Sequence, residues 1–250
     1  MIYGLTRDRF LGGRLTLAQP AKGFRSGVDA VFLAAAVPAR PGESVLELGL
    51  GVGAASLCLA ARVPGLGQVG VELQPAYADL ARENASANGI ALEVVTSDLR
   101  TLPVDLKSRS FDHVMANPPY FLRHRGTAAP DGGRETALGE DVPLADWVDA
   151  GLRRLKPGGR LTLILKAERL QDALCACDAR AGSLLIKPLA PRLDRAAELV
   201  ILQVRKGGRG ALRLLAPLIL HEGDRHEKDG ESYRPEVRDI LREAAPLPLA

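Results

Sequence analysis

The stretch Ser44-Val45-Leu46-Glu47-Leu48-Gly49-Leu50-Gly51-Val52-Gly53 decides the fold of this chain. Its first half is an apolar run of strand length, and its second half is a glycine turn that leads into an alanine-rich helical segment at residues 54–62. A buried strand, a glycine turn and a helix form the first unit of a doubly wound α/β sheet, in which the turn lets the backbone approach a ligand closely. Gly49, Gly51 and Ala54 also fit a dinucleotide-binding fingerprint, so the turn alone leaves the ligand open.

Two acidic residues at strand ends narrow the choice of ligand. Glu47 places a carboxylate just before the turn, where it would repel a pyrophosphate, and the turn carries a third glycine, Gly53. A carboxylate there suits a cationic ligand such as S-adenosylmethionine, which carries a sulfonium and an ammonium group. Glu72 ends the next predicted strand about twenty residues after the turn, where an acid accepts hydrogen bonds from both ribose hydroxyls. The alternative role for Glu72 is an ordinary acid ahead of the helix that begins at Pro75.

A third predicted strand, residues 92–96, runs into Ser97 and Asp98. Ser97 and Asp98 are positioned to accept a hydrogen bond from the adenine amine of the same ligand. The alternative role for Asp98 is an N-cap or turn residue, since aspartate is favoured at both kinds of position.

Asn117-Pro118-Pro119-Tyr120 follows the apolar run of residues 111–116 and is the strongest indicator of chemistry in the chain. The two prolines stiffen the turn and remove two N–H donors, which leaves the Asn117 amide oxygen and the Pro118 carbonyl as acceptors. A planar NH2 group that donates one hydrogen to each acceptor would have its lone pair directed at an electrophile, and Tyr120 offers a face on which a flipped base stacks. The alternative is a proline-rich turn after a strand.

Taken together, these residues resemble the class I S-adenosylmethionine-dependent methyltransferases, and most closely the tRNA1(Val) adenine N6-methyltransferase family. The resemblance covers nearly the whole chain and includes residues 22–30 before the first core strand, Arg134-Glu135, and the turn at residues 155–161. It also includes the tail, in which residues 218–220 and 231–236 resemble the family's closing strand, turn and tyrosine-containing helix. The Asn-Pro-Pro-Tyr turn is shared with DNA adenine and release-factor glutamine methyltransferases, so it specifies a planar NH2 acceptor and not which one. Leu50 and Val52 are bulkier than the residues usual in the glycine turn of this family.

The resemblance implies N6-methylation of an adenine in tRNA by direct transfer from S-adenosyl-L-methionine. The alternatives are a protein glutamine or DNA adenine amino-methyltransferase, and a non-catalytic cofactor-binding or RNA-binding module. The residues expected at the acceptor site are Asn117, Pro118, Pro119 and Tyr120. The residues expected to bind the cofactor are Phe24, Arg25, Ser26, Glu47, Gly49, Gly51, Gly53, Glu72, Leu73, Asp98, Leu99 and Asn117.

The alternation of strand-like and helical segments predicts a single α/β domain over residues 1–250, with helices on both faces of the sheet. Strands are expected near residues 44–48, 68–72, 91–96, 111–116, 160–165, 183–189 and 198–204. The link between the last two, residues 191–197, is too short for a crossover helix, so those strands should be antiparallel. The prediction is the class I methyltransferase (Rossmann-like) fold, a seven-stranded, mostly parallel sheet with an antiparallel last strand. Within residues 1–40, a hairpin over 9–17 and a helix at 28–37 that covers the cofactor form a substructure.

The composition is that of a compact cytoplasmic enzyme. With 250 residues, of which 46% are hydrophobic, the chain can bury one full core. No apolar stretch is long enough to span a bilayer and the N-terminus has no signal-peptide pattern, so we expect no membrane association. We also expect no metal site, because Cys175 and Cys177 form a C-x-C pair without a second pair and residues 221–226 form a charged turn.

The net charge of +3 is too small to indicate a nucleic-acid partner by itself, but the basic residues are clustered. Three arginines lie near the N-terminus, residues 123–125 follow the Asn-Pro-Pro-Tyr turn, and residues 205–209 form a basic turn after the last predicted strand. Basic groups beside a catalytic pocket suit a phosphate backbone, so tRNA is the expected partner. The alternative is a set of solvated loops, and the sequence leaves the oligomeric state open.

Overall fold

The glycine turn joins a buried strand to a helix, as the sequence predicts. Strand β3 (Ser44–Leu48) is buried from its second residue onward, and helix α2 (Ala54–Arg62) begins directly after Gly53. Gly49, Gly51 and Gly53 have φ angles of 71°, 57° and 87°. These angles lie in the left-handed region that L side chains rarely adopt, which explains why the turn is built from glycine.

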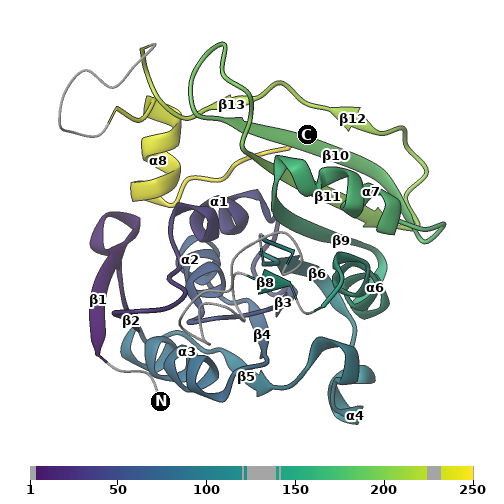
Figure 1. Ribbon diagram of the computed structural model, residues 1–250. Helices are drawn as coiled ribbons and strands as arrows, with labels where there is room; N and C mark the ends of the chain where they lie inside the picture. The colour runs from purple at the N-terminus through teal and green to yellow at the C-terminus, as the bar shows by residue number, and fades with distance from the viewer. Residues whose placement is uncertain (1–3, 120, 123–138, 141, 224–231, 250) are drawn as a thin grey trace.

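The structure is a computed structural model that describes residues 4–119, 121–122, 139–140, 142–223 and 232–249 (Figure 1). The other strands are β1 (Leu5–Phe10), β2 (Leu15–Pro20), β4 (Gly67–Glu72), β5 (Glu93–Thr96), β6 (Phe111–Ala116), β7 (Phe121–Leu122), β8 (Gly139–Glu140), β9 (Leu155–Lys166), β10 (Ala181–Ala190), β11 (Leu199–Lys206), β12 (Arg213–Leu214) and β13 (Leu218–Ile219). The other helices are α1 (Val28–Ala36), α3 (Pro75–Ala87), α4 (Val104–Lys107), α6 (Leu144–Arg154), α7 (Leu170–Ala176) and α8 (Pro235–Glu243), with 3-10 turns η1 (Leu11–Gly13), η2 (Leu99–Thr101) and η4 (Ala167–Arg169). Tyr120, residues 123–125, Arg134-Glu135 and residues 224–226 lie outside the described residues.

The central sheet has the order β12-β10-β11-β9-β6-β3-β4-β5, with β13 also paired to β10. β3, β4, β5, β6 and β9 run parallel, whereas β11 is antiparallel to both β9 and β10. The seven predicted strands and the antiparallel strand among them are confirmed. The described sheet has nine strands because the segment after β11 runs back alongside β10 and adds the short strands β12 and β13.

Helices cover both faces of the sheet, as predicted. Helices α1, α2, α3 and α8 lie on one side, and α4, α6 and α7 lie on the other (Figure 1). Each side has its own buried apolar cluster, the first around Phe32 and Leu57 and the second around Phe111 and Leu152. Removal of these large side chains from water stabilises the layered arrangement. No helix in the described part of the chain is long and apolar enough to cross a membrane.

The N-terminal hairpin is longer than predicted and is anchored to the first helical layer. β1 and β2 pair antiparallel from Leu5 opposite Pro20 to Phe10 opposite Leu15. The side-chain amide of Asn84 in α3 both accepts from Ala18 N at 2.7 Å and donates to Ala18 O at 3.0 Å. Because Asn84 is buried, these bonds hold the hairpin firmly beside α3.

Candidate active site

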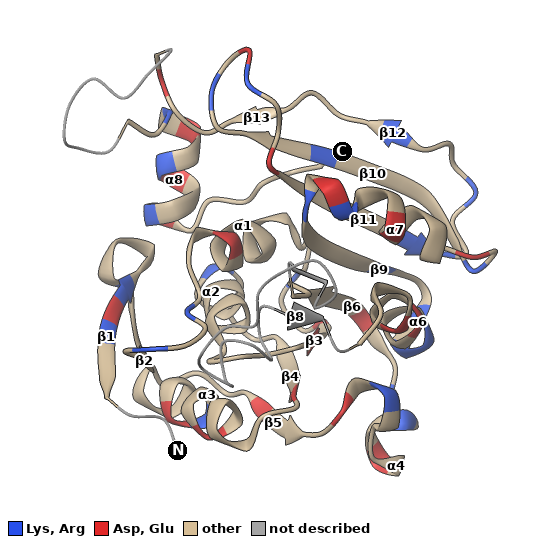
Figure 2. Cartoon of the chain, viewed as in Figure 1, with Lys and Arg blue, Asp and Glu red and all other residues tan. Residues whose placement is uncertain are grey.

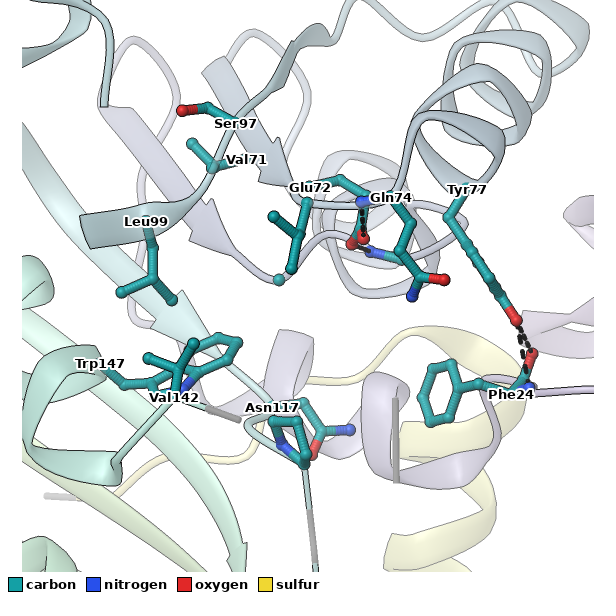
Figure 3. Close-up of a pocket in the computed structure, with 14 residues that line it drawn as sticks. Phe24, Val71, Glu72, Gln74, Tyr77, Ser97, Leu99, Asn117, Val142 and Trp147 are labelled. Atoms are coloured by element: carbon teal, nitrogen blue, oxygen red, sulfur yellow. Dashed lines mark hydrogen bonds between the residues drawn. The ribbon is translucent and has the colours of Figure 1, made fainter. Parts of the chain in front are cut away.

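A pocket opens where the parallel strands end at their carboxyl edge. The residues that line it come directly after β3, from the end of β4, and from the segments that follow β5 and β6. This is the edge of an open α/β sheet at which ligands are expected to bind. Eight residues predicted from the sequence lie on its wall: Phe24, Gly49, Gly51, Glu72, Leu73, Leu99, Asn117 and Pro119. Figure 3 shows Phe24, Glu72, Asn117 and Trp147 arranged around the same space.

Glu72 is held in place by two backbone N–H groups. Gly51 N donates to Oε2 and Gln74 N donates to Oε1, each at 2.8 Å. The side chain is buried, and burial raises its pKa, while the bonds from Gln74 and Gly51 lower it. Glu72 therefore links the end of β4 to the glycine turn with its carboxylate on the pocket wall, where the lone pairs left over face the ligand space.

The structure gives Glu47 a different role from the predicted one. Its Oε2 accepts hydrogen bonds from Ser56 N at 3.0 Å and from Ser56 Oγ at 2.5 Å, inside the first turn of α2. Glu47 is only 3% exposed and is not among the described residues that line the pocket. Burial raises the pKa of Glu47 to about 8, so the side chain is mostly neutral at pH 7. A neutral carboxyl turned toward α2 does not supply the negative charge that the sequence assigned to this position.

Asp98 takes the alternative role, that of a cap. It is the N-cap residue of η2, and its Oδ1 accepts from Arg100 N at 2.8 Å. The Arg100 guanidinium also donates to Oδ2 at 2.6 Å, and these bonds hold the pKa of Asp98 below its usual range. The neighbouring Ser97 and Leu99 line the pocket, whereas Asp98 does not.

Arg25 and Ser26 tie the segment before α1 to the hairpin. Arg25 donates to Thr6 Oγ1 at 2.6 Å and to the Pro20 carbonyl at 2.8 Å, and it forms an ion pair with Asp8 at 2.6 Å. Ser26 N donates to the side-chain oxygen of Gln19 at 2.8 Å. Neither residue lines the pocket, so their contribution is to position the preceding residue, Phe24.

Phe24 reaches the pocket and is fixed there by a residue that the sequence did not single out. Phe24 N donates to Tyr77 Oη at 3.2 Å, and Tyr77 Oη lies 3.4 Å from the Phe24 carbonyl, to which it donates. The predicted lid helix α1 itself is buried between Ala30 and Ala36 and contacts α2, α8 and β9. The part of this region that lies against the pocket is therefore Phe24, and no described residue of α1 lines it.

The remaining residues of the glycine turn serve packing. Gly53 caps α2, and a Cβ at this position would lie 3.5 Å from Ala81 Cβ of α3. Leu50 is buried with its methyl groups over Gly70, where a Cβ would come within 2.5 Å of them. Val52 is buried in the apolar cluster of the first helical layer. The bulk of Leu50 and Val52 therefore points into the core and leaves the pocket side of the turn clear.

The acceptor turn places an unpartnered amide oxygen at the pocket. Asn117 follows β6, and its Oδ1 is buried without a hydrogen-bond partner in the described part of the chain. Pro118 is buried behind the wall, while Pro119 lines it. A buried amide oxygen without a partner costs free energy that a ligand donor can recover.

Trp147 of α6 is the pocket residue that the sequence analysis missed most clearly. Its ring lies against Gly49, where a Cβ would come within 2.6 Å of Cη2. The indole is 7% exposed, and Nε1 has no hydrogen-bond partner within the described residues. Four further lining residues were not predicted: Val71, Gln74, Tyr77 and Val142. On the pocket wall, the acceptor on Asn117 and the donor on Trp147 are thus both buried without a partner among the described residues.

We expect Gly49→Ala to destabilise the protein more than Gly42→Ala. Both glycines have left-handed φ angles, 71° and 86°, so alanine suffers a similar backbone penalty at each. Only at Gly49 would the added methyl group meet the indole, since a Cβ at Gly42 has nothing within 4 Å. The extra overpacking cost is about 1–3 kcal/mol in the free energy of urea unfolding.

The chain has a single tryptophan, so the emission spectrum reports the same contact. Gly49→Ala should shift the emission maximum of Trp147, and Gly42→Ala should leave it unchanged. Equal losses of stability in the two variants, with unchanged spectra, would show that the indole does not rest on Gly49.

The basic turn at residues 205–209 lies at the other edge of the sheet. β11 is antiparallel to β9, so Leu199 pairs with Lys166 at the carboxyl edge and Arg205 pairs with Arg160. Arg160 is opposite His113, three residues before the end of β6, which places Arg205 roughly 10 Å from the pocket edge. Lys206 Nζ also donates to the Leu155 carbonyl at 2.7 Å, and burial lowers its pKa. These positions favour the alternative of a structural turn over a phosphate contact beside the pocket.

Comparison with known proteins gives consistent matches over most of the chain. A family model described as methyltransferase small domain matches residues 26–174. A tRNA1(Val) (adenine(37)-N6)-methyltransferase of Dickeya chrysanthemi is 30% identical over 229 residues, which cover 86% of this chain and 86% of that protein. A Porphyromonas gingivalis protein of the same name is 33% identical over 174 residues, 66% of this chain and 68% of its own. The crystal structure of a predicted O-methyltransferase from Agrobacterium tumefaciens superposes with a TM-score of 0.70 at 26% identity, covering 88% of this chain and 98% of that chain.

Proposed function

Because the chain belongs to the methyltransferase small-domain family, we propose that it transfers a methyl group from S-adenosylmethionine to the N6 amine of an adenine in tRNA. The observation that carries this proposal is the buried Oδ1 of Asn117, which follows β6 on the wall of the pocket and has no hydrogen-bond partner among the residues that the structure describes. No described residue donates to that oxygen, so a donor on a bound ligand would satisfy it. A primary amine on a planar ring is the donor that suits it.

The residues on the pocket wall fit an adenosyl ligand. We assign the ribose hydroxyls to Glu72, whose carboxylate is already oriented by Gly51 and Gln74. Gly51 leaves the backbone side of the turn open, and Leu73 and Leu99 supply apolar walls for a base. Phe24 closes the side of the pocket toward the hairpin. The other residues expected at the cofactor site lie off the pocket wall and hold these lining residues in position: Arg25, Ser26, Glu47, Gly53 and Asp98.

The acceptor turn does its work by orientation. When bound, S-adenosylmethionine supplies an electrophilic methyl group on a sulfonium, which is a good leaving centre. Asn117 Oδ1 and the Pro118 carbonyl each accept one hydrogen of the amine, which keeps the nitrogen lone pair out of the ring conjugation. With the amine held in this way, the lone pair on nitrogen would point at the methyl group that the cofactor would supply, sulfur would keep the electron pair of the broken bond, and the surplus proton on nitrogen would pass to water. Positioning of this kind supplies most of the rate enhancement in such a transfer. We assign Tyr120 to stacking against the base and Pro119 to shaping the wall.

The names of the relatives support an adenine in tRNA as the acceptor over the other planar NH2 groups, those of a DNA adenine and a protein glutamine. A DNA adenine and a protein glutamine both satisfy the same two acceptors, so the turn by itself does not separate them. The proposed substrate also places the enzyme in the cytoplasm, where tRNA is modified. We treat residues 1–250 as one methyltransferase domain, with the hairpin and α1 as its N-terminal substructure.

The direct test is methylation of unmodified tRNA with labelled S-adenosylmethionine, followed by digestion and nucleoside analysis. We expect the label in N6-methyladenosine. Label in a ribose O-methyl group or in another base would refute the proposed acceptor. Label in a release-factor-like protein, with tRNA unmodified, would assign the enzyme to the glutamine alternative.

A further inference from the structure

A second, larger cavity lies between the N-terminal hairpin, the start of α1 and helix α8. We call it the hairpin groove, and it is defined by Arg9, Gly12, Arg25, Gly27, Tyr233 and Arg242 on its walls. Its free volume is about 520 Å³, within the range of cavities that hold a nucleotide-sized ligand. Nothing in the roles assigned so far uses this space.

The hairpin groove is next to the active-site pocket. Phe24 lines the pocket, whereas the two residues that follow it, Arg25 and Ser26, line the groove. Consecutive Cα atoms are 3.8 Å apart, so the walls of the two cavities meet at the step from Phe24 to Arg25. The hydrogen bonds of Arg25 and Ser26 to the hairpin hold this boundary in place.

The charge of the groove is positive. Three arginines and one aspartate lie on its walls, and the aspartate, Asp8, is paired with Arg25. Arg9 is exposed and makes no hydrogen bond or ion pair with any residue that the structure describes. Figure 2 shows basic residues on β1 and on α8, which lie on the same flank of the molecule. Arg9 thus gives the groove positive charge that its aspartate does not neutralise.

An aromatic side chain completes the groove. Tyr233 lines it, and His221 is stacked on the tyrosine with ring centroids 4.6 Å apart and an angle of 20° between the planes. Aromatic rings together with arginines along a groove are the features by which proteins hold unpaired nucleotides.

We propose that the hairpin groove binds the single-stranded RNA that flanks the target adenine, with a phosphate at Arg9 and a base against Tyr233. This inference rests on the proposed function, since it takes the substrate to be RNA. The target base enters the pocket while its neighbour crosses the boundary at Arg25 into the groove. The groove therefore selects an unpaired stretch of RNA rather than an isolated adenosine.

The test compares Arg9→Glu with Arg209→Glu in binding and methylation of unmodified tRNA. The two arginines are matched, because both are exposed and neither has a hydrogen bond or ion pair among the described residues. Arg209 follows β11 at the opposite edge of the sheet. We expect Arg9→Glu to weaken tRNA binding about tenfold and to lower the salt slope of the binding constant by roughly one unit or more. Arg209→Glu should change binding less than twofold, and S-adenosylmethionine binding should be unchanged in both variants.

Two outcomes would overturn the groove assignment while leaving the proposed function intact. In the first, the wild type methylates tRNA and Arg9→Glu behaves like it at every salt concentration. In the second, both variants weaken binding equally, which would show a general charge effect. Arg242→Ala provides an independent second variant on the other wall of the groove, and it should also weaken tRNA binding without affecting the cofactor. If the wild type does not methylate tRNA at all, the proposed function fails first and the groove assignment fails with it.

Discussion

Asn117→Ala should lower the single-turnover rate of methyl transfer to tRNA by at least about a hundredfold. The substitution removes the buried oxygen that we assign to one of the two amine hydrogens, so the lone pair is no longer held toward the methyl group. The cofactor contacts assigned to Glu72 and to the glycine turn are untouched. S-adenosylmethionine affinity should therefore stay within about twofold of the wild type, because the lost interaction acts mainly in the transition state.

The two quantities can be measured separately. Titration of the single tryptophan, which lies on the pocket wall, follows cofactor binding, and rapid-quench experiments with saturating enzyme follow the chemical step. Asn117→Asp is the control, since it keeps an oxygen acceptor at the same position and should retain more activity than alanine. A fast Asn117→Ala variant would remove Asn117 from the proposed mechanism, and a loss confined to cofactor affinity would make it a binding residue only.

The fold could be predicted because its main determinants are local. β3 and α2 begin and end where the apolar run, the glycines and the alanine-rich segment place them. α3 begins at Pro75 and ends before Gly89, which follows the rule that proline opens a helix and glycine closes it. β13 lies where the resemblance predicted a closing strand, at residues 218–220. β12 was not predicted, because it is two residues long and forms only by pairing with β10.

The candidate site was predictable as a set of positions but not as a set of orientations. Strand ends indicate which residues reach the carboxyl edge, and for Glu72, Leu99 and Asn117 the structure puts them on the pocket wall. Whether a side chain turns into the pocket depends on partners elsewhere in the chain. Glu47 turns to Ser56, and Arg25 turns to the hairpin, because hydrogen-bond donors and acceptors there lie within reach.

Trp147 carried a weak signal that sequence reasoning did not use. It is the only tryptophan in the chain and lies in a helix that follows the acceptor turn. Its place over Gly49 depends on how α6 packs on the sheet, which no local pattern specifies. The position of the basic turn, in contrast, follows from the antiparallel last strand, which was predicted correctly. An antiparallel last strand carries its C-terminal end, and with it residues 205–209, to the edge opposite the pocket.

Glu47 should make the protein less stable as the pH rises from about 4.5 to about 8. Burial raises the pKa of its carboxyl from the unfolded value of 4.5 to about 8, so between these values the folded state binds a proton that the unfolded state has released. The stabilising contribution is complete below pH 4.5 and is lost as the pH rises through the folded pKa. A shift of this size corresponds to about 3–5 kcal/mol of unfolding free energy.

Glu47→Gln should remove that dependence, because a neutral amide oxygen can accept from Ser56 N and Ser56 Oγ at every pH. The measurement is urea unfolding at intervals from pH 5 to pH 9 for wild type, Glu47→Gln and Glu83→Gln, the last removing an exposed glutamate as the control. Wild type and Glu47→Gln should have similar unfolding free energies at pH 5, and at pH 9 Glu47→Gln should be more stable than the wild type by a few kcal/mol. Glu83→Gln should have the stability of the wild type at every pH. Because Glu47 faces α2 and not the pocket, Glu47→Gln should also bind S-adenosylmethionine normally at pH 7. A constant difference in stability across this range, together with a large loss of cofactor affinity, would mean that Glu47 is ionised and faces the ligand, as its position in the sequence suggested.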